Sequence, residues 1–269
     1  MPPEAFEHYA LGMEINRLSR HAGWLERERT WELLARHLPT PPATILDVGG
    51  GPGAYACGLA SQGYSVHLLD PVPLHIEQAL EISRRSSTPL ASATVGDART
   101  LAWTDASADA VLLLGPLYHL TDRKERLRAL REAHRVLKPG GIICAAAISR
   151  YASLLDGLWR RLADDPVFRK ILDGDLDNGQ HRNPTAHPMY FTTAFFHRPE
   201  EVAAELREAD FEEVDVLGIE SVGWLLPSLE VELGDRDRKE RLFDYLRKVE
   251  REPSLLGASA HLFATGRVT

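Results

Sequence analysis

The stretch ILDVGGGPGAYA, residues Ile45–Ala56, decides the fold of this chain. It places four glycines and one proline between an apolar run typical of a buried strand and a run typical of a helix. A plain turn from strand to helix rarely needs Gly49, Gly51 and Gly53 together. A backbone this bare predicts a ligand held close to the main chain.

Outward from this stretch, short apolar runs alternate with helical stretches. Strands are expected at about residues 44–48, 65–70, 90–97, 108–115 and 141–149, with further strands at 211–219 and 259–268. Strands this apolar, separated by helices, predict a parallel sheet buried on both faces. The fold class is therefore a doubly wound α/β core.

We expect one domain with four segments. Residues 44–149 would form the ligand-binding core and residues 199–269 its C-terminal part with a second helical insertion. Residues 1–43 would form an N-terminal helical cap segment and residues 150–198 a cap insertion. The aromatic residues of this insertion are expected to pack it on the core, and some of them to line a pocket: Tyr190, Phe191, Phe195 and Phe196.

Composition excludes several classes of function. A net charge of −8 would repel a phosphate backbone, and the basic run Arg123–Arg135 is interpreted as the solvated face of an amphipathic helix. The two cysteines, Cys57 and Cys144, imply no disulfide framework and no cysteine metal site, which favours the cytoplasm. Neither a membrane-spanning apolar run nor a signal peptide is expected.

Two ligands compete for the glycine turn. Gly49, Gly51 and Ala54 match the G-x-G-x-x-G/A dinucleotide fingerprint, with Asp70 at the end of the next strand as the ribose-binding acid. Pro52 argues against a diphosphate, because a proline supplies no N–H at the start of the helix. A carboxylate at Asp47 also suits an ammonium group better than a diphosphate.

These residues resemble the class I S-adenosylmethionine-dependent methyltransferases, in the small-molecule, type 11-like branch. Residues 47–53 match the D/E-x-G-x-G-x-G loop of that family, and Asp70 matches its ribose-binding acid. Asp97 and its neighbour Ala98 match the place where adenine is read. Residues 112–120, LLLGPLYHL, resemble the fourth motif, and residues 131–141 resemble the turn into the fifth strand.

The resemblance implies the strand order 3-2-1-4-5-7-6, with the last strand antiparallel to the others. S-adenosyl-L-methionine would lie across the carboxyl ends of strands 1 and 4. The cofactor-binding residues would be Tyr9, Arg17, Asp47, Gly49, Gly51, Gly53, Asp70, Asp97, Ala98 and Gly115. Tyr9 and Arg17 are eight residues apart, so one helix face could present both, and the arginine fork suits the methionine carboxylate.

Catalysis is assigned to Tyr118 and His119, which follow the fourth strand where the methyl group is expected. His119 could take a proton from the acceptor, although alignment and desolvation alone can suffice for methyl transfer. No metal is expected, because the four remaining candidate histidines match no ligand spacing and are interpreted as loop and cap residues: His181, His187, His197 and His261.

The function expected from these observations is methyl transfer to an oxygen, nitrogen or carbon of a small-molecule acceptor. The first alternative is an RNA methyltransferase, which the net charge and the departure of residues 115–118, GPLY, from the N/D-P-P-Y/F motif disfavour. A non-catalytic S-adenosylmethionine-binding protein and a nicotinamide dehydrogenase are further alternatives. The oligomeric state stays open, a homodimer included.

Overall fold

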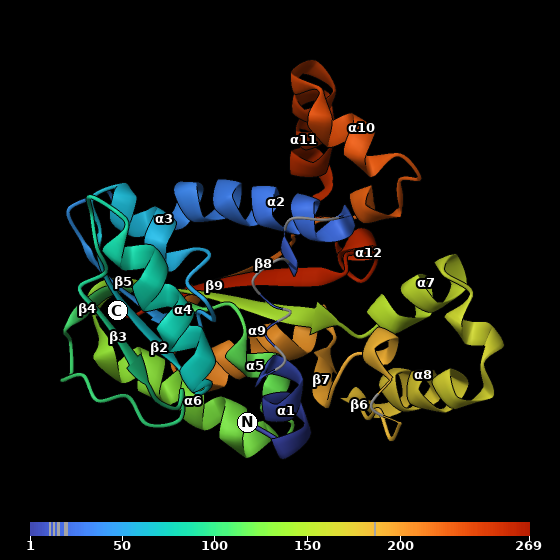
Figure 1. Cartoon of the computed structure of the whole chain (residues 1–269), viewed down its shortest axis with the longest axis horizontal. Coiled ribbons are helices and arrows are strands. Elements are labelled where there is room, and N and C mark those ends of the chain that lie inside the picture. Colours follow the sequence, from blue (N-terminus) through green and yellow to red (C-terminus); the bar gives the residue numbers. More distant parts are fainter. Residues whose placement is uncertain (11, 13, 15–16, 19–20, 186) are drawn as a thin grey trace.

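The computed structural model describes residues 1–269 apart from residues 11, 13, 15–16, 19–20 and 186 (Figure 1). Within the described residues, a nine-stranded sheet runs through the molecule. Its main strands are β1 (Thr44–Val48), β2 (Ser65–Asp70), β3 (Ser92–Val95), β4 (Ala108–Leu113), β5 (Leu137–Ser149), β8 (Glu212–Gly218) and β9 (His261–Arg267).

The strand order confirms the prediction. The parallel strands lie in the order β3-β2-β1-β4-β5. β9 then pairs antiparallel with β5, and β8 pairs antiparallel with β9. Numbered within the predicted core, β8 and β9 are strands 6 and 7, which gives 3-2-1-4-5-7-6. The carboxyl ends of β1 and β4 meet where the strand order reverses, as a ligand crevice requires.

Helices cover both faces of the sheet (Figure 1). On one face, α2 (His21–His37), α3 (Ala56–Ser61) and α4 (Pro73–Arg84) pack apolar side chains against the strands. On the other face lie α6 (Arg123–Val136) and α9 (Pro199–Glu208). Burial on both faces explains why the strands are almost continuously apolar rather than alternating.

The segment expected as a cap insertion contributes to the sheet itself. β7 (Ala194–His197) pairs in parallel with the carboxyl end of β5, and β6 (Gln180–His181) pairs with β7. Before them come α7 (Ala152–Trp159), a 3-10 turn at Leu162–Asp164 and α8 (Pro166–Asn178), with a second turn, Pro188–Tyr190, between β6 and β7. The aromatic run is therefore fixed to the core by backbone pairing as well as by packing.

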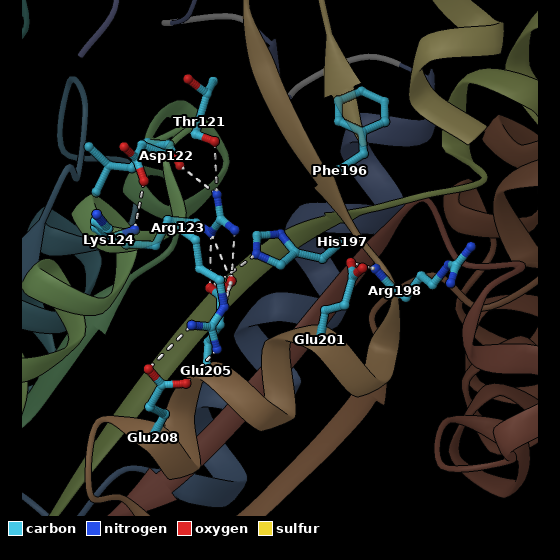
Figure 2. Close-up of polar contacts among 12 residues, drawn as sticks. Thr121, Asp122, Arg123, Lys124, Phe196, His197, Arg198, Glu201, Glu205 and Glu208 are labelled. Carbon is cyan, nitrogen blue, oxygen red and sulfur yellow. Dashed lines mark hydrogen bonds and ion pairs between the residues drawn. The ribbon is translucent and has the colours of Figure 1, made fainter. Parts of the chain in front are cut away.

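A buried charged cluster lies behind β7 and corrects the interpretation of α6 as a helix with a wholly solvated basic face. Arg126 is 2% exposed, and its guanidinium donates to both carboxylate oxygens of Glu205 on α9 at 2.7–3.1 Å. Its third nitrogen donates to the carbonyl of Leu120. Figure 2 shows Glu205 and His197 turned toward one another beside Arg123. The cluster joins α6, α9 and β7 to the loop after His119.

The C-terminal insertion is helical, as expected. It comprises a 3-10 turn at Gly223–Leu225, α10 (Leu229–Gly234), α11 (Arg236–Val249) and α12 (Pro253–Leu256). Its apolar side chains pack around Leu25 of α2. Among the described residues, the helices are all too short or too polar to cross a bilayer.

Candidate functional site

The glycine turn follows the carboxyl end of β1 in a backbone conformation that is unfavourable for residues with a side chain. Gly49 and Gly51 have φ values of 75° and 57°, in the left-handed region. A Cβ at Gly49 would lie 2.5 Å from Cγ of Pro116, and a Cβ at Gly115 would lie 3.2 Å from the carbonyl oxygen of Gly49. The first and fourth strand ends therefore approach one another at a distance that only glycine allows.

A cavity of about 1030 Å³, including its mouth, lies over this turn. Its lining includes Glu14 and Pro116. It also includes eleven of the predicted site residues: Tyr9, Arg17, Asp47, Gly49, Gly51, Asp70, Asp97, Ala98, Gly115, Tyr118 and His119. Gly53 does not line it. A Cβ there would lie 3.2 Å from Sγ of Cys57 and 3.3 Å from Cβ of Ala79, so this glycine serves the packing of α3 on α4.

Asp47 is the most unusual group of the cavity. Its side chain is 1% exposed, and neither carboxylate oxygen has a hydrogen-bond partner among the described residues. Burial, together with the nearby carboxylate of Asp70, raises the pKa of Asp47 to about 7, against the lowering effect of the Ala56 amide. A buried carboxylate without a partner is costly, and a cation in the cavity would relieve that cost.

Asp70 is held in place by backbone amides. The N–H of Gly51 donates to Oδ2, and the N–H of Val72 donates to Oδ1, each at 2.9 Å. Nδ1 of His75 lies 3.0 Å from Oδ1, within hydrogen-bond distance. The side chain of Asp70 thus joins the glycine turn, the residue before α4 and the end of β2.

Asp97 and Ala98 form the far wall of the cavity. Arg99 donates to both oxygens of Asp97 at 2.6 and 2.8 Å, and this hydrogen-bonded pairing lowers the pKa of Asp97 to about 2. Arg99 already pairs with the carboxylate of Asp97. A heterocyclic ring bound here would therefore contact the backbone of Ala98, a residue that is 8% exposed, rather than an unpaired carboxylate.

Tyr9 and His119 meet across the cavity although they are far apart in sequence. The Tyr9 hydroxyl lies 2.8 Å from Nε2 of His119, and Nδ1 of His119 lies 3.4 Å from the carbonyl of Thr193. The carbonyl can only accept, so Nδ1 carries the proton and Nε2 accepts from Tyr9. Burial lowers the pKa of His119 to about 4, so the ring is neutral at pH 7. Tyr118 lies edge-on to the same ring at 4.7 Å.

Arg17 lines the cavity, but its fork is already occupied. Its two terminal nitrogens donate to Glu26 on α2 at 2.6 and 2.9 Å, and Nε donates to Glu14 at 2.8 Å. The guanidinium has five N–H groups, so two are left for a ligand. The predicted contact with a methionine carboxylate would have to use at least one of these two.

A second cavity of about 950 Å³ adjoins the first. Tyr9, Arg17 and Tyr118 line both of them. The second cavity is largely aromatic, and its wall includes Phe168, Tyr190, Phe191, Phe196 and Trp224. Phe195 is not among the lining residues, since its ring lies under the guanidinium of Arg126 at 3.8 Å.

Three of the four histidines interpreted as loop and cap residues lie in strands, the first being His181 in β6. His197 is fully buried on β7, and His261 begins β9 of the core. Ligand atoms of His261, Glu26 and Glu220 come within 4.8 Å of one another. The sequence concealed this cluster because its members are 41 to 235 positions apart and follow no ligand spacing.

Comparisons with known proteins agree with this geometry. A family model described as a methyltransferase domain matches residues 46–145. The ubiquinone/menaquinone biosynthesis C-methyltransferase UbiE of Caulobacter vibrioides is 33% identical over 132 residues, which are 45% of this chain and 51% of that protein. The chloroplastic 2-methyl-6-phytyl-1,4-hydroquinone methyltransferase of Arabidopsis thaliana is 31% identical over 125 residues, 45% of this chain and 35% of that protein.

A solved structure extends the similarity of fold beyond the matched segment. Phosphoethanolamine N-methyltransferase 2 of Haemonchus contortus, in complex with S-adenosyl-L-methionine, aligns with a TM-score of 0.55 at 18% identity, over 90% of this chain and 52% of that one. The chain spans about half or less of the length of the two curated relatives described above. Residues 46–145 therefore match a methyltransferase domain, and the chain as a whole shares the fold of S-adenosylmethionine-dependent methyltransferases.

Proposed function

We propose that this protein transfers a methyl group from S-adenosyl-L-methionine to a small-molecule acceptor. One observation carries the proposal. The cavity over the glycine turn holds a buried carboxylate, Asp47, with no partner of its own among the described residues, and it opens beside a second, aromatic cavity. The first cavity suits a cationic adenosine derivative, and the second suits the molecule that receives the methyl group.

The residues present fit S-adenosylmethionine, whose sulfonium centre supplies an activated methyl group when bound. We assign Asp47 and the amides of the glycine turn to its aminoacyl part, with one of the two N–H groups of Arg17 that no described residue accepts available to its carboxylate. Asp70, held by Gly51 and Val72, presents its carboxylate where ribose hydroxyls would lie. Ala98 would contact the adenine.

The acceptor would enter the second cavity, which is lined by Tyr9, Arg17 and Ala22 of the N-terminal segment and by aromatic side chains of the insertion, residues 150–198. Tyr9 and Tyr118 stand at the boundary of the two cavities. Enclosure by aromatic side chains excludes water and limits the poses of the acceptor, so alignment supplies much of the rate. A pocket enclosed in this way favours metabolites over polymers.

We propose that His119 acts mainly by positioning Tyr9. Its pKa of about 4 makes the ring a poor proton acceptor at neutral pH, and its Nε2 already accepts from the Tyr9 hydroxyl. The neutral ring fixes that hydroxyl at the boundary where the acceptor meets the cofactor. The sequence-based role of His119 as a base stays a prediction, which the variants described in the Discussion test.

Turnover provides the test of this function. Purified protein is incubated with S-adenosylmethionine and a panel of aromatic small molecules, and S-adenosylhomocysteine is quantified. We expect formation above the rate without acceptor, and loss of it in Asp47→Asn. Cofactor binding without turnover on any acceptor would indicate a non-catalytic binding protein, and tight salt-sensitive binding of RNA would indicate a nucleic-acid methyltransferase.

The free cysteines Cys57 and Cys144 bear on location. Unpaired thiols are typical of a reducing compartment. We propose the cytoplasm on this ground.

A further inference from the structure

The charges on the wall of the second cavity are distributed unevenly. Arg17 and His261 line it on the side of the cofactor cavity. Glu26 and Glu220, which pair with them, have side chains that are only 12% and 1% exposed. Glu14, the other partner of Arg17, lines the first cavity, and none of the three acids is among the described lining residues of the second. The cations therefore face the second cavity, and their carboxylate partners do not.

His261 is held as a donor. Its Nδ1 lies 2.6 Å from Oε1 of Glu220, and its backbone N–H donates to Oε2 of the same residue at 2.9 Å. Glu26 approaches Nδ1 to 3.8 Å. Burial alone would lower the pKa of His261, but Glu26 and Glu220 together raise it to about 9, against a small opposing effect of Arg17. The ring is therefore an imidazolium at neutral pH.

The orientation of this ring leaves one edge for a ligand. Nδ1 is directed at Glu220, while Nε2 has no hydrogen-bond partner within the part of the chain that the structure describes. The side chain of His261 is 22% exposed and lines the cavity. A charged N–H without a partner is a strong donor to an anionic oxygen. Two N–H groups of Arg17 have no acceptor among the described residues, and one of them is left for such an oxygen when the other binds the cofactor carboxylate.

The other titratable groups of the cavity are already paired. Both ring nitrogens of His181 face acceptors, at 2.9 Å from Oδ2 of Asp175 and 2.6 Å from the carbonyl of Tyr190. Asp156, whose pKa burial raises, accepts from Arg160 at 3.1 Å. Neither side chain competes for a ligand at the cofactor end of the cavity.

We propose that the acceptor is an aromatic molecule that carries an anionic oxygen, a carboxylate or a phenolate, and that His261 and Arg17 bind this oxygen. The inference rests on the proposed methyltransferase function and names its substrate class. The aromatic body of the acceptor would lie against Phe191 and Phe196, while the anion points toward the boundary with the cofactor cavity. Charge complementarity at two cationic donors would then select acids over their neutral analogues.

A metal ion at Glu26, Glu220 and His261 is the competing interpretation of the same cluster. The ligand atoms are close enough, but Nδ1 of His261 donates to Glu220, and Glu26 is bidentate to Arg17. Binding a divalent cation would have to break both pairs and deprotonate the imidazole. The experiment below includes this outcome.

Matched pairs of neutral and anionic probes test the proposal. Binding of benzoate is compared with that of benzamide, and binding of ionised 4-nitrophenol with that of nitrobenzene, by calorimetry with the protein saturated by S-adenosylhomocysteine. We expect wild-type protein to prefer at least one anionic member by about tenfold or more. His261→Gln should remove most of that preference and leave affinity for the neutral member and for the cofactor product unchanged.

Two further variants separate the role of charge from that of folding. Arg17→Lys keeps the charge without the fork and should retain part of the preference. The control His134→Gln changes a histidine on α6 that lines neither cavity, and it should behave as wild type. Thermal unfolding of each variant is measured beside the binding.

Several results would overturn the inference. These are equal or stronger binding of the neutral probes, no binding of any probe, and an unchanged preference in folded His261→Gln. A preference that appears only with added Zn²⁺ and vanishes with a chelator would assign the cluster to a metal instead. Failure of the proposed function would show separately: S-adenosylhomocysteine, which is titrated before the probes are added, would then not bind.

Discussion

The buried carboxylate of Asp47 lowers the stability of the folded protein at neutral pH, and we propose that it strengthens the binding of a cationic ligand. Its pKa of about 7 in the folded protein lies above the ordinary value of 3.8, so the folded state retains a proton that the unfolded state releases. This contribution to stability is fully present below pH 3.8 and is lost as the pH rises through 7. The cost falls on the form without ligand, where the carboxylate has no partner among the described residues.

The substitution Asp47→Asn should therefore have opposite effects on stability and on binding. At pH 8 we expect the free variant to be more stable than wild type by about 1–4 kcal/mol, with the difference shrinking toward pH 5. Its affinity for S-adenosylmethionine should be lower than that of the wild type. We expect the affinity of the wild type to increase between pH 6 and 8 and that of the variant to stay constant. Urea unfolding and calorimetry at both pH values measure this. A variant less stable at pH 8, with cofactor affinity intact, would refute this role of Asp47.

The pair of Tyr9 and His119 makes a prediction of non-additivity. If His119 positions the Tyr9 hydroxyl, His119→Ala and Tyr9→Phe should each lower turnover by a similar factor, with little change in cofactor affinity. The double variant should then be no slower than the worse single variant. Additive losses, or a Tyr9→Phe variant as fast as wild type, would instead support His119 as an independent base.

At the scale of elements, the loop after α5 (Pro116–His119) depends on a charged cluster outside the cavity. Arg126 joins the carbonyl of Leu120 to Glu205 on α9, and burial opposed by His197 and Arg126 leaves the pKa of Glu205 at about 2. This pairing stabilises the fold above the ordinary pKa of a glutamate, and the contribution is lost as the pH falls toward 2.

Removal of the arginine tests this link. Arg126→Met leaves Glu205 buried without its main partner and should cost about 3–5 kcal/mol of folding free energy at pH 7. The comparison is Arg123→Met, because Arg123 is half exposed, pairs mainly with Glu208 at the surface and approaches Glu205 only to 3.8 Å, so that the loss should be smaller. Chemical unfolding compares the two. If both substitutions lowered the free energy of unfolding equally, the buried cluster would contribute no more to stability than a surface ion pair.

The sequence predicts the strands and turns that have a local residue pattern. It does not predict the features that depend on contacts with residues distant in sequence. The strand β4 is predicted by the apolar run at residues 110–113, and the glycine turn by its need for residues without side chains. β7, only four residues long, looked like packing inside an insertion. The burial of Arg126 could not be foreseen, because its partner Glu205 lies 79 residues away.

The site divides in the same way. Eleven of the residues assigned from motifs line one cavity, because a motif encodes the contacts of a ligand with its own loop. The cluster of Glu26, Glu220 and His261 comes from α2, the bend after β8 and the start of β9, which only the folded sheet brings together. The proposed acceptor side of the site is thus a property of tertiary structure, and the cofactor side largely a property of sequence.

At the scale of the whole molecule, the sheet brings two cavities together at the ends of β1, β4 and β5. The N-terminal helix α1 (Pro3–Ala10) supplies Tyr9 to both of them. The insertion that holds α8, β6 and β7 supplies most of the aromatic wall of the second cavity; Figure 1 shows α1 close to β7. Cofactor and acceptor would share a boundary formed by residues from segments distant in sequence. Closure over both would exclude water from the transfer.

The most direct test of this account is calorimetric titration of the free protein with S-adenosylmethionine, beside parallel titrations with NAD and ADP. We predict a saturable isotherm of one site per chain for S-adenosylmethionine, weakened in Asp47→Asn, and no heat beyond dilution for either phosphorylated nucleotide. Clear binding of NAD or ADP with none of S-adenosylmethionine would contradict it.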